Sequence, residues 1–156
     1  MENRVCAGDG QRAKIIAEAR RWIGTPYRHQ ASLLGVGCDC LGLVRGVWRE
    51  LYGAEPEVPG PYTADWAEAG KNEQMADAAF RHFLPVTNGT IAGGDLLLFR
   101  WRNGLPAKHA AIAISSNRMI HAHDGAQVCE VTISARWSYR IAFVFSFPDQ
   151  LADKRG

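Results

Sequence analysis

The sequence lacks three features that each define a class of protein. No stretch approaches the roughly 18 uninterrupted apolar residues of a membrane span, and the opening "MENRVCAGDG" has no apolar signal-peptide core. The charges nearly balance, since 18 Lys and Arg stand against 16 Asp and Glu, and no basic run could follow a phosphate backbone. We therefore expect synthesis in the cytoplasm without a signal peptide, no membrane span and no nucleic-acid partner.

Cysteine is also scarce, and its spacing does not suit a disulfide framework. The four cysteines are Cys6, Cys38, Cys40 and Cys129. A single residue separates Cys38 from Cys40, so a bridge between these two would be strained. The sequence therefore predicts reduced thiols.

Helical patterns dominate the first half of the chain. Apolar residues recur with helical spacing over residues 11–23, and again from Asp39 to a stop at Gly53. Residues 63–83 are mostly helix formers, with a break expected near Gly70. We expect two amphipathic helices followed by an interrupted third.

The second half has the character of a sheet. After Pro85 come the short β-type runs "DLLLFRW", "HAAIAIS", "RMIHAH", "VCEVTIS" and "RIAFVFSF", separated by turn residues. Helices followed by strands predict an α+β fold, with N-terminal helices packed on an antiparallel sheet of five to six strands. The length of 156 residues suits one domain, 1–156, with loose tails at 1–10 and 149–156.

Cys40 has a position that suits a nucleophile. Asp39 is a good N-cap, which places Cys40 in the first turn of a helix. Unpaired N–H groups and the helix dipole favour a thiolate there, so position alone is expected to activate the sulfur. The ordinary alternative is a small buried side chain.

The histidines supply candidates for a base and for the residue that orients it. His109 begins one strand, and His121 and His123 follow on the next. A turn centred on Ser115 pairs His109 with His121, whereas a turn centred one residue later pairs it with His123. Periodicity leaves both partners open.

One strand face offers room for a helix. His109, Ala111 and Ala113 share that face, and the small alanines would let a helix lie close against the sheet. We expect that helix to be the one that carries Cys40.

The segments "GTPY", "DCLGLV", "GDLLLF" and "HAAIAISSNRMIHA" resemble, in order and spacing, the NlpC-type cysteine peptidases, a papain-like family that cleaves peptidoglycan peptides. The resemblance covers most of the chain. It implies Cys40 as nucleophile, His109 as base and His121 as the orienting residue, which centres the turn on Ser115. Tyr27 is implied near the cysteine, where it would help to hold substrate or the oxyanion. No metal or organic cofactor is implied.

Two departures from the family pattern lie close to the expected substrate. Leu41 follows the cysteine where the family usually has Ser, and "RHQASLLGVGC" fills the loop after Tyr27. Both resemble the branch found in phage-like tails and gene transfer agents. This implies tail-tip or hub proteins as partners and action at the cell wall of a target cell. The implied bond joins D-γ-glutamate to diaminopimelate, and residues 54–85 are expected to be a variable insertion.

Three alternatives use the same residues differently. Cys38, Cys40, His121 and His123 could bind zinc tetrahedrally in a structural module. A papain-fold acyltransferase would share the cysteine and histidine chemistry, and a tail-assembly protein could retain a vestigial site. Apart from the zinc set, Cys38 is expected to be a packing residue and Asp95 a turn former.

Overall fold

The computed structural model describes residues 5–58 and 73–149 of the chain. Its helices are α1 (Asp9–Arg21), α2 (Cys40–Tyr52), α4 (Gln74–His82) and α5 (Ala135–Ser138). A short hairpin pairs β1 (Ser32–Leu33) with β2 (Gly37–Cys38). The main sheet is built from β3 (Leu84–Pro85), β4 (Leu96–Phe99), β5 (His109–Ala113), β6 (Arg118–His121), β7 (Cys129–Thr132) and β8 (Ile141–Ser146).

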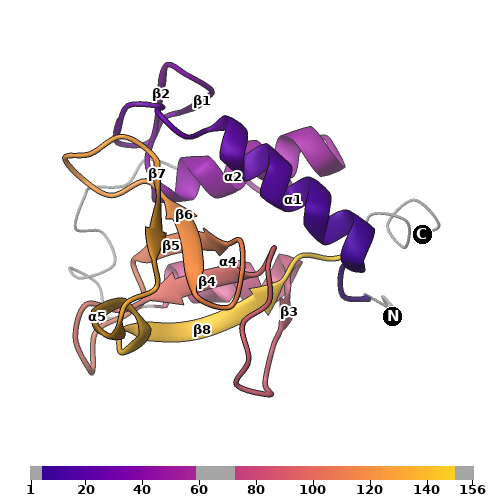
Figure 1. The fold of residues 1–156 in the computed structure, drawn as a ribbon, viewed down its shortest axis with the longest axis vertical. Coiled ribbons are helices and arrows are strands. Elements are labelled where there is room, and N and C mark those ends of the chain that lie inside the picture. Colours follow the sequence, from indigo (N-terminus) through magenta and orange to yellow (C-terminus); the bar gives the residue numbers. More distant parts are fainter. Residues whose placement is uncertain (1–4, 59–72, 150–156) are drawn as a thin grey trace.

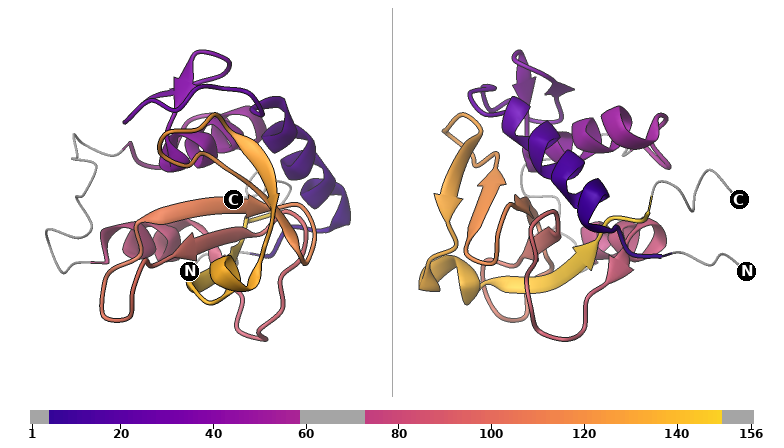
Figure 2. Two further views of the ribbon diagram at one scale, coloured as in Figure 1. Left: turned by 60° about the vertical axis from the view of Figure 1, so that its left-hand side comes forward. Right: turned by 45° about the vertical axis from the view of Figure 1, so that its right-hand side comes forward.

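The main sheet is antiparallel and, within the described residues, has six strands in the order β3-β8-β4-β5-β6-β7. Figures 1 and 2 show α1 and α2 together on one side of it, with α5 beside β8 at the opposite side. The predicted α+β class, with helices packed on an antiparallel sheet, is therefore confirmed. None of the helices in the described ranges has the length and apolarity to cross a bilayer.

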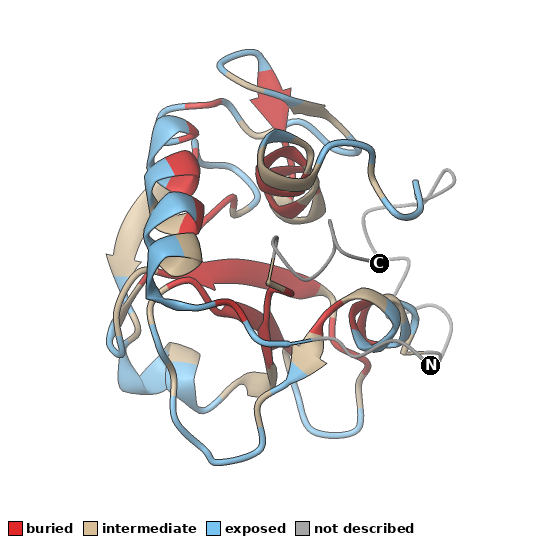
Figure 3. Ribbon diagram, turned by 90° about the vertical axis from the view of Figure 1, so that its right-hand side faces the viewer, coloured by how far each residue is buried: buried red, intermediate tan, exposed pale blue. Residues whose placement is uncertain are grey.

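Helix α2 begins and ends where the sequence predicts. The Asp39 carboxylate accepts a hydrogen bond from Gly42 N at 2.7 Å, which caps α2. Gly53 ends the helix with a φ of 87°, a conformation that glycine adopts without strain. α1 packs closely on α2, because the ring of Trp22 lies where a Cβ on Gly46 would be. Figure 3 shows the buried face of α1 turned toward this core.

Two clusters of buried side chains lie on the two faces of β5. The larger joins α1, α2 and α4 to the face that carries Ala110 and Ile112. The smaller contains Ala111 and Ala113, which point the other way because side chains alternate along a strand. The expectation that α2 packs on the face of His109, Ala111 and Ala113 is therefore wrong. Ala110 supplies the small side chain that lets the helix approach on the other face.

The described parts of both chain ends are held in the fold. Backbone hydrogen bonds join residues 5–7 to residues 147–149, and α1 begins soon afterwards. The expected loose tails are therefore wrong for these residues, because paired backbone groups and helix order them. The rest of the two tails, residues 1–4 and 150–156, lies outside the described residues.

Within the segment 54–85, α4 and β3 account for the described second part. The helix expected over 63–83 is shorter, since α4 begins at Gln74, and the portion 63–72 lies outside the described residues. That the segment is an insertion stays a prediction. The β1–β2 hairpin and α5 were not predicted, because two-residue strands and a four-residue helix are too short to show periodicity.

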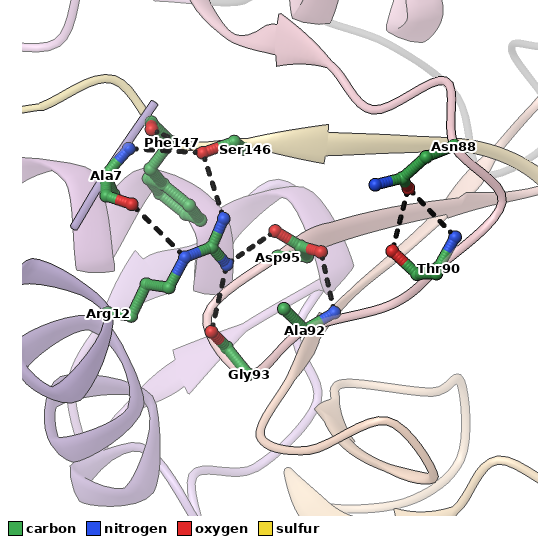
Figure 4. A network of polar contacts seen from close by, with 9 residues as sticks. All are labelled: Ala7, Arg12, Asn88, Thr90, Ala92, Gly93, Asp95, Ser146 and Phe147. Carbon is green, nitrogen blue, oxygen red and sulfur yellow. Dashed lines mark hydrogen bonds and ion pairs between the residues drawn. The ribbon is translucent and has the colours of Figure 1, made fainter. Parts of the chain in front are cut away.

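A polar network joins the N-terminal helix to the sheet (Figure 4). Asp95 Oδ2 accepts a hydrogen bond from Ala92 N at 2.9 Å, which confirms the predicted turn-forming role. Its other oxygen pairs with the Arg12 guanidinium at 2.7 Å. Arg12 also donates to the carbonyl oxygens of Ala7 and Gly93, at 3.2 and 3.0 Å. The ion pair fixes α1 against the turn before β4, a long-range contact that no local pattern indicates.

Candidate active site

Cys40 is the first residue of α2, and its sulfur lies against the backbone at the start of β5. Cys40 Sγ is 3.9 Å from the carbonyl oxygen of Lys108. The backbone N–H groups of Ala110 and Leu41 also hydrogen-bond to the sulfur. The thiol thus contacts the chain on both sides of His109. Among the described residues, it has no hydrogen bond to an imidazole nitrogen.

The environment of Cys40 favours the protonated thiol. Burial raises its pKa to about 12, the nearby Asp39 carboxylate raises it further, and the N–H groups of Ala110 and Leu41 act in the opposite direction. Although the residue as a whole is partly exposed, its sulfur is surrounded by protein atoms. The expectation that position alone activates the sulfur is therefore wrong. Desolvation outweighs the helix start, and Asp39 both caps the helix and opposes the negative charge.

His109 and His121 form a buried pair of imidazoles. His109 Nε2 lies 2.9 Å from His121 Nδ1, and each residue keeps only 3% of its surface exposed. Burial first, and then the charges of His121 and His123, hold the pKa of His109 well below its ordinary value. Burial and His123 lower the pKa of His121 to about 4. Both rings are therefore neutral at neutral pH, and one ring donates the shared hydrogen bond to the other.

The strand register differs from the one expected from the resemblance. β5 and β6 pair Ile112 with Ile120 and Ala113 with Met119, which centres the turn one residue later than Ser115. Continued along both strands, this register brings His123 opposite His109. The expected register is therefore wrong, and the His109–His121 hydrogen bond is diagonal across the strand pair. Diagonal neighbours on one face are within reach of long side chains.

Two tryptophans complete the cluster and were not singled out from the sequence. Trp137 on α5 is stacked on His109, with ring centroids 5.5 Å apart, and meets His121 edge-on at 5.1 Å. Trp101 is stacked on His109 at 5.4 Å and lies 5.9 Å from Trp137. Residues from four separate segments meet here, so no spacing within the sequence signals the contact.

Tyr27 lies within electrostatic reach of Cys40. The pKa of its hydroxyl is raised to about 12, first by burial and then by the acidic groups of Cys40, Asp39 and Asp124. Its backbone forms a bridge with Cys38, which ties the tyrosine loop to the residues in front of α2. The hydroxyl is therefore protonated at neutral pH and able to donate a hydrogen bond. Its role with substrate stays a prediction.

The sequence model of the NlpC/P60 family matches residues 24–145, which include all of these site residues. The chain belongs to the NlpC/P60 family. A relative in Escherichia coli (strain K12), "Murein DD-endopeptidase MepS/Murein LD-carboxypeptidase", is 31% identical over 111 residues. That match covers 71% of this chain and 49% of the relative, so the chain spans about half the length of that protein.

Solved structures share the fold. The crystal structure of the NlpC/p60 domain of the peptidoglycan hydrolase SagA is 28% identical with a TM-score of 0.57, over 87% of this chain and 98% of that one. A lipoprotein-like NLP/P60 protein from Staphylococcus aureus has a TM-score of 0.62 at 19% identity, over 93% of this chain and 44% of that one, and shows the fold alone. The six-stranded sheet of this chain and the helices packed on it therefore have the NlpC/P60 fold.

The described residues do not provide the ligand geometry that a structural zinc site would need. Within residues 5–58 and 73–149, no three His, Cys, Asp or Glu side chains are arranged to hold a metal ion. Cys38 has no exposed surface and belongs to the large core cluster, which fits its expected packing role. His121 uses Nδ1 to hydrogen-bond His109. The residues of the C-x-C and H-x-H pairs therefore do not converge as a ligand set.

An apolar cavity of about 120 Å³ lies between α2 and α4. Leu41, Val44 and Trp48 line it from α2, and Ala110 lines it from β5. Cys40 and the two histidines of the buried pair, His109 and His121, are not among the residues that line it. Leu41, the residue that departs from the family pattern, thus faces a cavity next to the site and not the imidazole pair.

Proposed function

We propose that this chain is a cysteine peptidase that hydrolyses peptidoglycan stem peptides, with Cys40 as nucleophile, His109 as base and His121 as the orienting residue. The observation that carries the proposal is the arrangement of Cys40, His109 and His121 in a chain of the NlpC/P60 family. The sulfur contacts the backbone on both sides of His109, whose Nε2 is hydrogen-bonded to His121. A thiol, a base and a group that orients the base are the parts that acyl transfer requires.

The mechanism begins from a neutral thiol and a neutral imidazole. Because His109 Nε2 is engaged by His121, the remaining Nδ1 is the atom that takes the thiol proton. The Cys40 thiol has no hydrogen bond to an imidazole nitrogen among the described residues, so we expect its bond to His109 Nδ1 to form as substrate binds and excludes water, because catalytic contacts are often long before substrate is bound. Proton transfer accompanies attack of the sulfur on the peptide carbonyl, so no resting thiolate is required.

We propose two donors for the oxyanion. They are the backbone N–H of Cys40, at the start of α2, and the protonated hydroxyl of Tyr27, whose pKa is raised in part by Cys40. His109 then protonates the leaving amine, and the acyl-enzyme is hydrolysed by a water that His109 deprotonates. His121 maintains the imidazole tautomer through both steps and stabilises the transient imidazolium.

The substrate class follows from the family, and the bond is a finer proposal. We propose the D-γ-glutamyl to diaminopimelate bond of a Gram-negative stem peptide, as the motif resemblance implies. The E. coli relative is named as a murein DD-endopeptidase and LD-carboxypeptidase, activities that cleave different bonds. These bonds release fragments of different mass, so product analysis distinguishes them.

The decisive experiment is digestion of purified peptidoglycan, with the released fragments identified by mass spectrometry. The wild-type chain should release stem-peptide fragments, and Cys40→Ala should release none while retaining the same circular dichroism spectrum. Fragments attached to an added amine acceptor would instead indicate the acyltransferase. No release by a folded wild-type chain would refute the peptidase and favour a vestigial site.

We also propose a setting in a phage-like or gene transfer agent particle, where the chain opens the wall of the target cell beside tail-tip or hub proteins. The support is the departure of Leu41 and of the loop after Tyr27 from the usual family pattern. Immunodetection of the chain in purified particles tests the setting independently of activity. Its absence from particles that carry a complete tail would contradict it.

A further inference from the structure

We propose that Trp137 is a positioning residue that holds the His109 and His121 rings in their hydrogen-bonded geometry and keeps water from that bond. The inference deepens the proposed peptidase function and rests on it. It concerns a residue on α5, a four-residue helix far from the nucleophile in sequence. No resemblance or motif points to this position.

Trp137 is the ring that contacts every histidine of the cluster. It is stacked on His109 with an interplanar angle of 28°, and it meets His121 at 89° with centroids 5.1 Å apart. It also meets His123 edge-on, with centroids 5.7 Å apart. Contacts in these mutually different orientations fix the plane of each imidazole, because a rotated ring would lose the stacked or edge-on arrangement.

The cluster restrains Trp137 in turn. Phe99 meets its ring edge-on at 5.3 Å, and Trp101 lies 5.9 Å from it. The tryptophan also packs on the small apolar cluster that contains Ala111 and Ala113, beneath the histidines. The indole therefore has a defined place between the sheet and the imidazole pair, as a positioning residue requires.

The electrostatic consequence has a definite sign. Burial is the first cause of the low pKa values of His109 and His121, followed by their histidine neighbours. The titratable groups that act on His109 are His121 and His123, whereas β4 and α5 contribute the uncharged rings of Phe99 and Trp137. Removing the indole admits water, which stabilises the imidazolium and raises both pKa values toward the ordinary histidine value.

The test uses Trp137→Leu, which keeps apolar volume but removes the ring, and Trp137→Phe, which keeps a ring. With soluble stem peptides, Trp137→Leu should lower kcat by about 10-fold or more with little change in KM, because misplacement of a base by about an ångström is costly. The acid limb of its pH–rate profile should move to higher pH. Trp137→Phe should recover most of both properties.

The control is Val144→Ala, which removes packing from the same apolar cluster on β8. It should lower the melting temperature and leave the pH–rate profile unchanged. If Trp137→Leu alters only the melting temperature, or only KM, the residue is structural or binds substrate, and the proposal is overturned.

A second measurement needs no activity, so it separates this inference from the proposed function. Titration of the histidine ring C–H signals by NMR should give higher pKa values for His109 and His121 in Trp137→Leu than in the wild type. Unchanged values in a folded variant would overturn the positioning role. If the wild-type chain cleaves no peptide but the two pKa values are still higher in Trp137→Leu, the peptidase function is refuted and the positioning role of Trp137 stands.

Discussion

His109 hydrogen-bonds His121 diagonally across β5 and β6, at 2.9 Å between Nε2 and Nδ1, although the β5–β6 register, continued past the paired residues, would bring His123 opposite it. His123 stays close, with its ring centroid 5.5 Å from that of His109. It is half-buried, whereas the other two histidines are buried. The two candidate orienting residues therefore differ in contact and in solvation, which makes their variants informative as a pair.

We predict that His121→Ala lowers kcat on stem peptides by on the order of 100-fold, because the His109 ring loses the partner that sets its tautomer. His123→Ala should keep most of the activity, since no hydrogen bond joins it to His109 among those of the described residues. Steady-state kinetics at pH 7.5 on both variants, with thermal melts to verify folding, makes the comparison. Greater loss in His123→Ala would assign the orienting role to the residue that faces His109 in the register.

The thiol gives a prediction about chemical labelling. Because burial raises the pKa of Cys40 to about 12, its thiolate is scarce at mildly acidic pH. A limiting alkylating reagent at pH 5.5 should therefore label the exposed Cys6 before Cys40. Peptide mass spectrometry of the labelled chain gives the order. Earlier labelling of Cys40 would mean that a thiolate–imidazolium pair exists before substrate binds.

Much of the site could be predicted because its parts have local signals. The N-cap at Asp39 and the stop at Gly53 define α2, so the position of Cys40 at the helix start follows from neighbouring residues. The register of β5 and β6 cannot be read from neighbouring residues in the same way. A slip of one residue in the turn leaves the apolar pattern of a strand that is buried on both faces almost unchanged.

Contacts between distant parts of the chain explain the other features that the sequence does not predict. Trp137 meets the histidines only through tertiary packing on the smaller cluster, and α5 is too short to be recognised from its sequence. The pKa of the Cys40 thiol also depends on a contact between distant parts of the chain. The helix start is a local feature, whereas the burial that outweighs it comes from β5, far along the chain.

Folding stability should fall as the pH is lowered through the range in which the buried histidines would charge. His121 binds a proton near pH 6.5 when unfolded but only near pH 4 when folded, so between these values the unfolded state holds more protons. The free energy of unfolding should therefore decrease from pH 7 toward pH 4. His109, whose pKa is also lowered, adds to the trend.

Urea unfolding at pH 7.5, 6 and 5 measures this dependence. His121→Gln should have a weaker dependence than the wild type, because one of the groups that takes up a proton on unfolding is gone. Equal slopes in the two proteins would show that His121 is not held neutral by the fold.

Gly42 offers a test of how closely the loop after Tyr27 must pack on the nucleophile helix. A Cβ at this position would overlap the carbonyl oxygen of Ala31, which accepts a hydrogen bond from Asp39 N at 3.3 Å. Gly42→Ala should therefore cost about 1–3 kcal/mol of stability, as overpacking does elsewhere, and should also lower kcat because Asp39 and Cys40 move with the loop.

Gly10→Ala is the matched control, because it lies in the first turn of α1 with nothing within 4 Å of its Cβ position. It should be neutral or stabilising by up to about 1 kcal/mol, since alanine restricts the unfolded chain more than glycine does. Chemical unfolding and kcat on stem peptides are measured for both variants. If Gly42→Ala retains full activity, the loop can shift without moving the sulfur, and the placement of Cys40 depends on β5 alone.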